Sequence, residues 1–163
     1  MATATEAIDI RDSLTSWLGA LTAMTSADVK AIPADKWTVS MGGCARAANE
    51  LLADTIANLR WTTAALKGES SDAYANGFGG LAAELTNQDE AVAALRQAAA
   101  EFSQALKAAS DEILNSTVTA PWGMPTPVAM LANVAVSHVW YHDGQFNFIH
   151  CLLGDDKMHW MEP

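Results

Sequence analysis

Apolar residues recur every three or four positions in four long segments of the 163-residue chain. This spacing places them on one face of an α-helix. Runs rich in Val, Ile and Thr, which are typical of strands, are few. We therefore expect an all-α protein that folds as a four-helix bundle. The predicted helices run from about Thr5 to Met24, from about Cys44 to Lys67, from about Asn87 to Leu114, and from Thr126 to Gly154.

Several helix ends carry recognisable capping residues. Gly68 fits the C-terminal cap of the second helix. Asn87 with Glu90 has the spacing of a capping box at the start of the third. Thr126 as N-cap, with Pro127 in the first turn, is a strong start signal for the fourth.

The connections between the predicted helices are long rather than tight. This weakens the case for a simple up-down-up-down order and allows a crossover. We expect a short extended piece at Thr117–Thr119, and a short helix after the Ser/Gly-rich stretch at 69–80. The tail after Gly154 is expected to pack back through Trp160. Residues 1–163 are expected to form one domain with its own core.

The charge balance is strongly acidic, with a formal net charge of −10 and a sequence pI of about 4.6. An acidic surface repels phosphate groups, so nucleic acids and anionic membrane surfaces are disfavoured as partners. Residues 113–142 contain no charged side chain, but Pro121, Pro125 and Pro127 interrupt them, which disfavours a membrane span. The first residues lack the features of a signal peptide and the two cysteines form no disulfide framework, so the expected location is cytoplasmic.

The candidate chemistry lies in the fourth predicted helix. His138 and His142 are four residues apart and therefore share one helix face. Buried imidazoles need polar partners, and a divalent metal would satisfy both. The alternative is a pair of structural histidines held by ordinary hydrogen bonds. The other residues of this largely apolar stripe are Leu131, Ala135, Gln145, Ile149 and Leu152.

A third ligand would have to come from another helix. In the second, Asp54 stands among apolar neighbours, which is unusual for a carboxylate unless it is paired. The equally weighted alternative is that Asp54 faces solvent opposite an apolar stripe. Asn58 shares the Asp54 face, and Glu50, one turn earlier, is a weaker candidate. Trp122 lies just before the fourth helix and is placed to line a pocket mouth.

The run His138-x-x-Tyr141-His142-Asp-Gly-Gln145-x-Asn147, followed by Leu-Gly-Asp155, resembles the last helix of the DinB-like superfamily. The Leu-Lys-Gly that closes the second helix is similar too. The resemblance implies a four-helix bundle, commonly dimeric, that holds a divalent metal, often nickel or zinc, through three histidines. His138 and His142 match two of them. The third, on the second helix, aligns with Asp54, and no histidine precedes His138.

The resemblance also implies chemistry. Some relatives are thiol-dependent transferases or isomerases, in which the metal favours the thiolate of a low-molecular-weight thiol, and a hydrolase-like activity is a further option. A second hypothesis is a non-enzymatic dimeric bundle, stress-related, whose histidines bond to Asp54 or Asn58. A third is a pocket for an apolar small molecule. A structural His–Asp pair is expected to raise the histidine pKa, so its stabilisation would fade as pH rises, whereas acid would empty a metal site.

Overall fold

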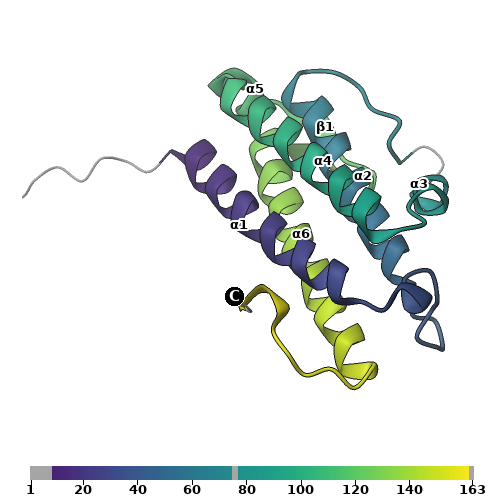
Figure 1. The fold of residues 1–163 in the computed structure, drawn as a ribbon. Coiled ribbons are helices and arrows are strands. Elements are labelled where there is room, and N and C mark those ends of the chain that lie inside the picture. Colours follow the sequence, from purple (N-terminus) through teal and green to yellow (C-terminus); the bar gives the residue numbers. More distant parts are fainter. Residues whose placement is uncertain (1–8, 75–76, 162–163) are drawn as a thin grey trace, which may run out of the picture.

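The computed structural model describes residues 9–74 and 77–161, which are mainly helical (Figure 1). The all-α four-helix bundle expected from the sequence is confirmed. Its long helices are α1 (Ile10–Ala31), α2 (Ala48–Leu66), α4 (Gln88–Ala108) and α6 (Val128–Leu152). The connections carry the 3₁₀ turns η1 (Ala34–Lys36) and η2 (His159–Met161), the helices α3 (Gly79–Glu84) and α5 (Asp111–Asn115), and the strands β1 (Thr117–Thr119) and β2 (Pro125–Pro127).

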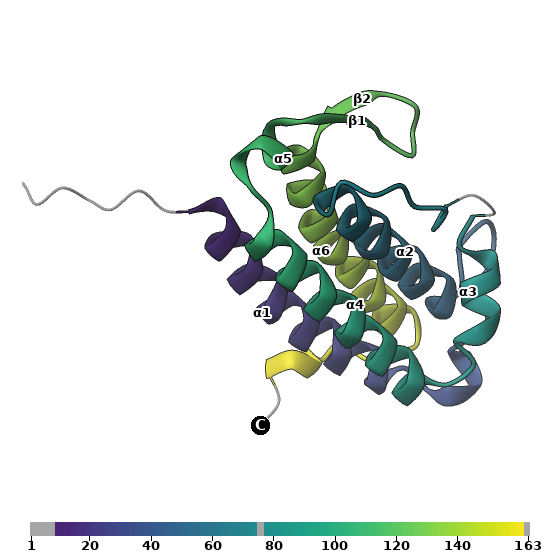
Figure 2. The ribbon, with the colours of Figure 1, turned by 90° about the horizontal axis from the view of Figure 1, so that it is seen from above.

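Long helices that follow one another in the chain do not all pack side by side. α1 packs against α4 and α6, and α2 packs against the same two helices. α1 and α2 therefore stand at opposite corners of the bundle, as do α4 and α6 (Figures 1 and 2). The connection from α1 to α2 and the one from α4 to α6 are thus the crossovers that the long connections allowed. The result that matters for the site is that α2 and α6 lie side by side.

The core between the helices is apolar and closely packed. Phe102 of α4 and Phe146 of α6 are fully buried in it. Trp37, also fully buried, closes one end, and its indole N–H donates to the Leu85 carbonyl oxygen at 2.8 Å. A buried indole N–H needs such an acceptor, so this bond fixes the connection after α1 against the end of α3. The remaining fully buried large side chains include Leu18, Leu21, Leu52, Ile56, Leu59, Leu95 and Leu106.

The end of the first helix was predicted too early, because α1 continues past Met24 to Ala31. The polar residues after Met24 favoured a connection, yet Ser26 is buried and its hydroxyl donates to the Thr22 carbonyl oxygen at 2.6 Å. A hydroxyl bonded to the carbonyl four residues earlier can remain inside a helix. The helix stops just before Pro33, because a residue that precedes proline is driven to extended conformation. The predicted start near Thr5 lies outside the described residues.

The third predicted helix is interrupted in the structure. α4 ends at Ala108 instead of running on to Leu114. A separate helix, α5, then begins, because the Ser110 hydroxyl accepts a hydrogen bond from the Ile113 N–H and caps a new start. The expected N-cap of α4 is confirmed, since the Asn87 side chain accepts from the Glu90 N–H at 2.9 Å.

The start of the last helix also differs from the prediction. Thr126 was expected to cap it, but Thr126 pairs with Val118 in the antiparallel hairpin of β1 and β2. Pro127 is the N-cap instead, without a side-chain hydrogen bond, and the helix begins at Val128. The extended piece expected at Thr117–Thr119 is confirmed as β1.

The C-terminal caps of α2 and α6 are alike. Gly68 follows α2 with φ of +73°, as expected, and the Glu69 N–H donates to the Ala64 carbonyl oxygen at 2.9 Å. Gly154 does the same after α6 with φ of +82°. The second helix begins at Ala48 rather than near Cys44. Within 9–74 and 77–161, no helix has the length and apolar character that crossing a bilayer requires.

Candidate metal centre between α2 and α6

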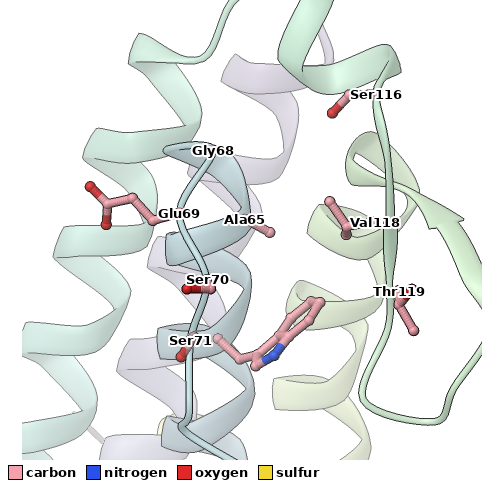
Figure 3. Close-up of a pocket in the computed structure, with 9 residues that line it drawn as sticks. Ala65, Gly68, Glu69, Ser70, Ser71, Ser116, Val118 and Thr119 are labelled. Carbon is pink, nitrogen blue, oxygen red and sulfur yellow. The ribbon is translucent and has the colours of Figure 1, made fainter.

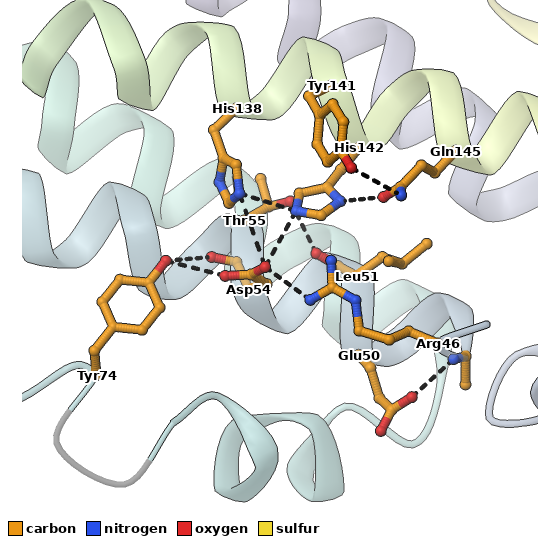
Figure 4. A network of polar contacts seen from close by, with 11 residues as sticks. Arg46, Glu50, Leu51, Asp54, Thr55, Tyr74, His138, Tyr141, His142 and Gln145 are labelled. Atoms are coloured by element: carbon orange, nitrogen blue, oxygen red, sulfur yellow. Dashed lines mark hydrogen bonds and ion pairs between the residues drawn. The ribbon is translucent and has the colours of Figure 1, made fainter. Parts of the chain in front are cut away.

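One carboxylate of α2 meets the two histidines of α6 (Figure 4). The Asp54 Oδ2 atom lies 3.3 Å from His142 Nε2 and 3.8 Å from His138 Nε2. The two Nε2 atoms lie 3.0 Å from each other. Asp54 therefore faces α6 and not solvent, and its side chain is only 14% exposed. The structure brings together the three residues that the sequence singled out.

The separations of these donor atoms match those around a tetrahedral ion. Ligands about 2.1 Å from a zinc-sized ion in tetrahedral geometry lie about 3.4 Å from one another. The three observed separations, 3.0, 3.3 and 3.8 Å, bracket this spacing. Two imidazoles and one carboxylate are also a donor set that zinc and nickel accept. The residues present therefore fit a divalent metal.

The ring of His142 is held in the orientation that a ligand needs. The side chain is fully buried, and its Nδ1 atom contacts the Gln145 Oε1 atom. An amide oxygen only accepts, so Nδ1 donates to it, and this contact turns Nε2 toward Asp54. Fixing the far nitrogen of a histidine in this way is what metal sites do with the partners of their ligands. Gln145, expected beside the site, thus orients His142.

Asp54 is held by two residues that the sequence analysis missed. The Arg46 guanidinium donates to Oδ2 at 2.8 Å, and the Tyr74 hydroxyl donates to Oδ1 at 3.0 Å (Figure 4). Burial opposes the charge of Asp54, but hydrogen bonds from His142 and Arg46 outweigh it and hold the pKa of Asp54 well below its usual range. The carboxylate is therefore ionised at neutral pH and available to a cation.

The two missed residues differ in how they could have been found. Arg46 stands eight residues before Asp54 and just before α2 begins, so a basic residue close to the candidate ligand was visible in the sequence. Tyr74 reaches the site from the connection that follows α2 (Figure 4). The path of such a connection leaves no periodic signal.

The expected rise in histidine pKa is wrong for His138. Burial, and then the neighbouring His142 ring, lower the pKa of His138 to about 4, although the Asp54 carboxylate acts in the opposite direction. His138 is consequently neutral at pH 7, the form that ligates metals. Acid then disfavours both the metal-free cluster and a metal-bound one, so the direction of the pH effect does not separate them. Metal content must be measured directly.

A cavity of about 400 Å³ opens beside His138. Its walls include Asn58, Tyr74 and Trp122, of which Trp122 is 49% exposed. Trp122 therefore stands at a pocket mouth, as the sequence suggested. His138 is the residue that connects this cavity to the donor cluster.

Glu50 lies beside the cluster but has another partner. Its carboxylate accepts a hydrogen bond from the Ala47 N–H at 2.8 Å, at the start of α2 (Figure 4). A different cavity, also about 400 Å³, lies between the end of α2 and β1, where Trp61, Glu69 and Val118 contribute to its lining (Figure 3). Its lining contains no histidine, so this cavity is separate from the donor cluster between α2 and α6.

Comparison with known proteins places the fold. No family model matches the chain, and no curated protein matches its sequence. Two crystal structures of the mycothiol-dependent maleylpyruvate isomerase are similar to it. One, of a histidine-to-alanine mutant, aligns with a TM-score of 0.70 at 14% identity, and the other with 0.66 at 15%. The chain therefore shares the helical-bundle fold of these isomerase structures.

The shared bundle accounts for part of each neighbour. Each alignment covers 85% of this chain and 61% of the neighbouring chain. The chain thus spans about three fifths of the length of the isomerase structures it matches. At this level of identity the likeness establishes the fold alone. The activity in the neighbours' names is a property of those proteins.

Proposed function

We propose that this DinB-like bundle binds a divalent metal, nickel or zinc, through Asp54, His138 and His142, and acts as a metal-dependent thiol transferase or isomerase. The observation that carries the proposal is the convergence of three ligand atoms from α2 and α6 at spacings suited to one ion. Tyr74 and Gln145 would serve as the outer partners that fix the ligands.

The proposed co-substrate is a low-molecular-weight thiol. The similar solved structures are named as mycothiol-dependent, which supports a thiol of that class. A bound divalent cation would supply stabilisation of the thiolate form. The cavity beside His138 would receive the thiol or its partner, with Trp122 and Tyr74 as apolar walls that exclude water and Asn58 as a polar contact.

A cobalt-loaded sample tests this proposal directly. Addition of mycothiol should produce a sulfur-to-cobalt charge-transfer band in the near ultraviolet, because a thiolate would enter an open coordination position. The band should be absent from His138→Ala and present in Asn133→Ala, a matched change at an outer position of α6. A cobalt spectrum that no thiol alters would count against thiol chemistry and leave a metal site of other use.

The non-enzymatic hypothesis has its own support. In the metal-free cluster, Asp54 already has three polar partners, which is enough to satisfy a structural carboxylate. A purified protein that binds no metal at all would favour it. A co-purifying apolar ligand in the cavity beside His138 would instead favour the small-molecule hypothesis.

Three further expectations stay predictions: a single domain over residues 1–163, a cytoplasmic location, and a homodimer. Exposed tryptophans on α1 and α6 support a symmetric interface at this surface. Trp17 and Trp140 are each nearly half exposed there, with ring centroids 5.5 Å apart. Light scattering after size exclusion should give twice the chain mass of 17.3 kDa.

A further inference from the structure

A second group of ligating side chains lies at the far end of α6. His150, Asp155 and His159 each offer a ligand atom, and these atoms lie within 4.8 Å of one another. His150 is eight residues beyond His142, which corresponds to about 12 Å along the helix. This cluster is therefore separate from the Asp54 cluster, and the proposed function does not use it.

The chain end is folded so as to bring these residues together. After Gly154 turns the backbone, the Asp155 N–H donates to the His150 carbonyl oxygen at 2.9 Å. The Lys157 N–H then donates to Asp155 Oδ1 at 3.1 Å, which fixes the carboxylate. Its other oxygen, Oδ2, lies 3.1 Å from His159 Nε2. The local fold thus positions both carboxylate oxygens of Asp155.

The tautomer of His150 suits a ligand. The side chain is 1% exposed, and its Nε2 atom lies 2.9 Å from the Asp28 carbonyl oxygen of α1. Because a carbonyl only accepts, Nε2 must carry the proton, which leaves the Nδ1 lone pair free to ligate. Metal-bound histidines commonly donate their other N–H to a backbone carbonyl in this way. Burial also lowers the pKa of His150, which favours the neutral form.

The charges around the cluster favour a cation. The Asp155 carboxylate supplies a negative charge beside the two imidazoles, with Oδ2 3.1 Å from His159 Nε2. The centroids of the His150 and His159 rings lie 4.5 Å apart. A simple ion pair between Asp155 and protonated His159 would leave the His150 lone pair unused, whereas a metal would engage all three side chains.

We propose that His150, Asp155 and His159 form a second divalent-cation site, of the zinc class, which pins the C-terminal segment to α6 and, through the Asp28 carbonyl, to α1. Two imidazoles and a carboxylate are ligands for zinc-class ions, with water completing the shell. Such a site is structural, because it joins η2, the turn after α6, and α1. It stands on a different observation from the proposed function and can hold when that function fails.

Peptide-resolved hydrogen exchange on the metal-stripped full chain, with and without Zn²⁺, tests this second site. Zn²⁺ should slow exchange in the segment 155–161 in the wild type and equally in His138→Ala, which removes a ligand of the first cluster. Asp155→Asn and His159→Gln should abolish the slowing and remove one equivalent of bound zinc, or weaken its binding by at least about tenfold. Asp156→Asn, which changes the adjacent exposed carboxylate, should behave as the wild type.

The outcomes separate the two sites. Zinc retained by His138→Ala and lost from His159→Gln supports the second site, whether or not the first cluster binds metal. Zn²⁺ that leaves exchange at 155–161 unchanged, or slowing that survives both Asp155→Asn and His159→Gln, would overturn it. Cys151 is exposed next to His150, so slowing lost in Cys151→Ser but kept in Asp155→Asn would assign the zinc to the thiol and also overturn the proposal.

Discussion

The carboxyl groups that lie at the two faces of α6 have pKa values shifted in opposite directions. On the α2 face, Asp54 receives hydrogen bonds from Arg46 and Tyr74, and its pKa lies well below the usual range. On the α1 face, burial, together with the nearby Asp28 carboxylate, raises the pKa of Asp143 to about 6. Asp28 receives a hydrogen bond from the Asn147 amide, but burial outweighs it and raises the pKa of Asp28.

This contrast teaches that the supply of donors decides the charge, and not the residue type. His142 and Asp143 are adjacent, yet each belongs to a different cluster, because neighbouring helical residues point in different directions. The α2 face presents the ionised Asp54 carboxylate to a neutral His138, which suits a cation. The carboxyl pair on the α1 face is held closer to neutral and serves to pack α1 against α6.

The largest effect is expected from His142→Ala, which removes one of the three side chains of the cluster between α2 and α6. It removes a fully buried ring, and the cavity and the lost hydrogen bond should lower the free energy of unfolding by about 3 kcal/mol. It should also remove the bound metal. Urea unfolding and metal analysis measure the two effects. His138→Ala, at a side chain that is 21% exposed, should lose the metal with a smaller loss of stability. Metal retained in both variants would exclude the cluster as the site.

The next effect tests the α1 face by pH. Asp143 has a folded-state pKa of about 6, above the unfolded value of about 3.9. Its stabilisation is therefore complete below pH 3.9 and is lost as pH rises through 6, by about 2 to 3 kcal/mol. Asp143→Asn should not show this loss and should be more stable than the wild type at pH 7.5. Urea unfolding of metal-free protein from pH 4 to 7.5 checks it, and parallel profiles would contradict the shared burial of Asp28 and Asp143.

Asp54→Asn tests the opposite slope on the α2 face. Because the folded-state pKa of Asp54 is lowered, its stabilisation is present above the unfolded value and is lost as pH falls. The variant should be less stable at pH 7 by about 1 to 2 kcal/mol, since charge-assisted hydrogen bonds are lost, and its acid transition should be less steep. Unfolding curves from pH 7 down to 3 measure this. Equal acid sensitivity in the two proteins would show that Asp54 is not the acid-labile group.

The smallest effect is expected from Arg46→Gln. The Arg46 guanidinium bonds to the Asp54 Oδ2 atom that faces both histidines, so it competes with a cation for that oxygen. Its removal should tighten metal binding about threefold, a modest gain because Arg46 is partly exposed and screened. Calorimetric titration with Zn²⁺ measures the affinity, with Arg60→Gln on the exposed side of α2 as control. Weaker binding would show that Arg46 is needed to hold Asp54 in place.

The fold class could be predicted because the helical spacing of apolar residues in four long segments is visible in a single sequence. The predicted helix boundaries were wrong where polar side chains form hydrogen bonds with nearby backbone groups. Ser26 remains inside α1 by bonding to the Thr22 carbonyl, and Ser110 starts a new helix by capping it. Both are hydrogen bonds between neighbours, which hydrophobic periodicity does not register.

The candidate site was predictable as far as helix geometry reaches. The spacing of His138 and His142 fixes their shared face, and the packing of α2 against α6 supplies Asp54. Tyr74 enters from a connection, and the turn after Gly154 brings Asp155 and His159 to His150. Contacts of this kind depend on the path of irregular segments, so the spacing of residues in the sequence does not predict them.

The most direct test of the central claim is the metal content of tag-free protein loaded with nickel or zinc, compared among the wild type, Asp54→Ala and His142→Ala, all in the His159→Gln background that removes the second cluster. The account predicts about one metal per chain in the background protein and none in either added variant. Metal that persists in both, or is absent from all three, would contradict a divalent site formed by Asp54, His138 and His142.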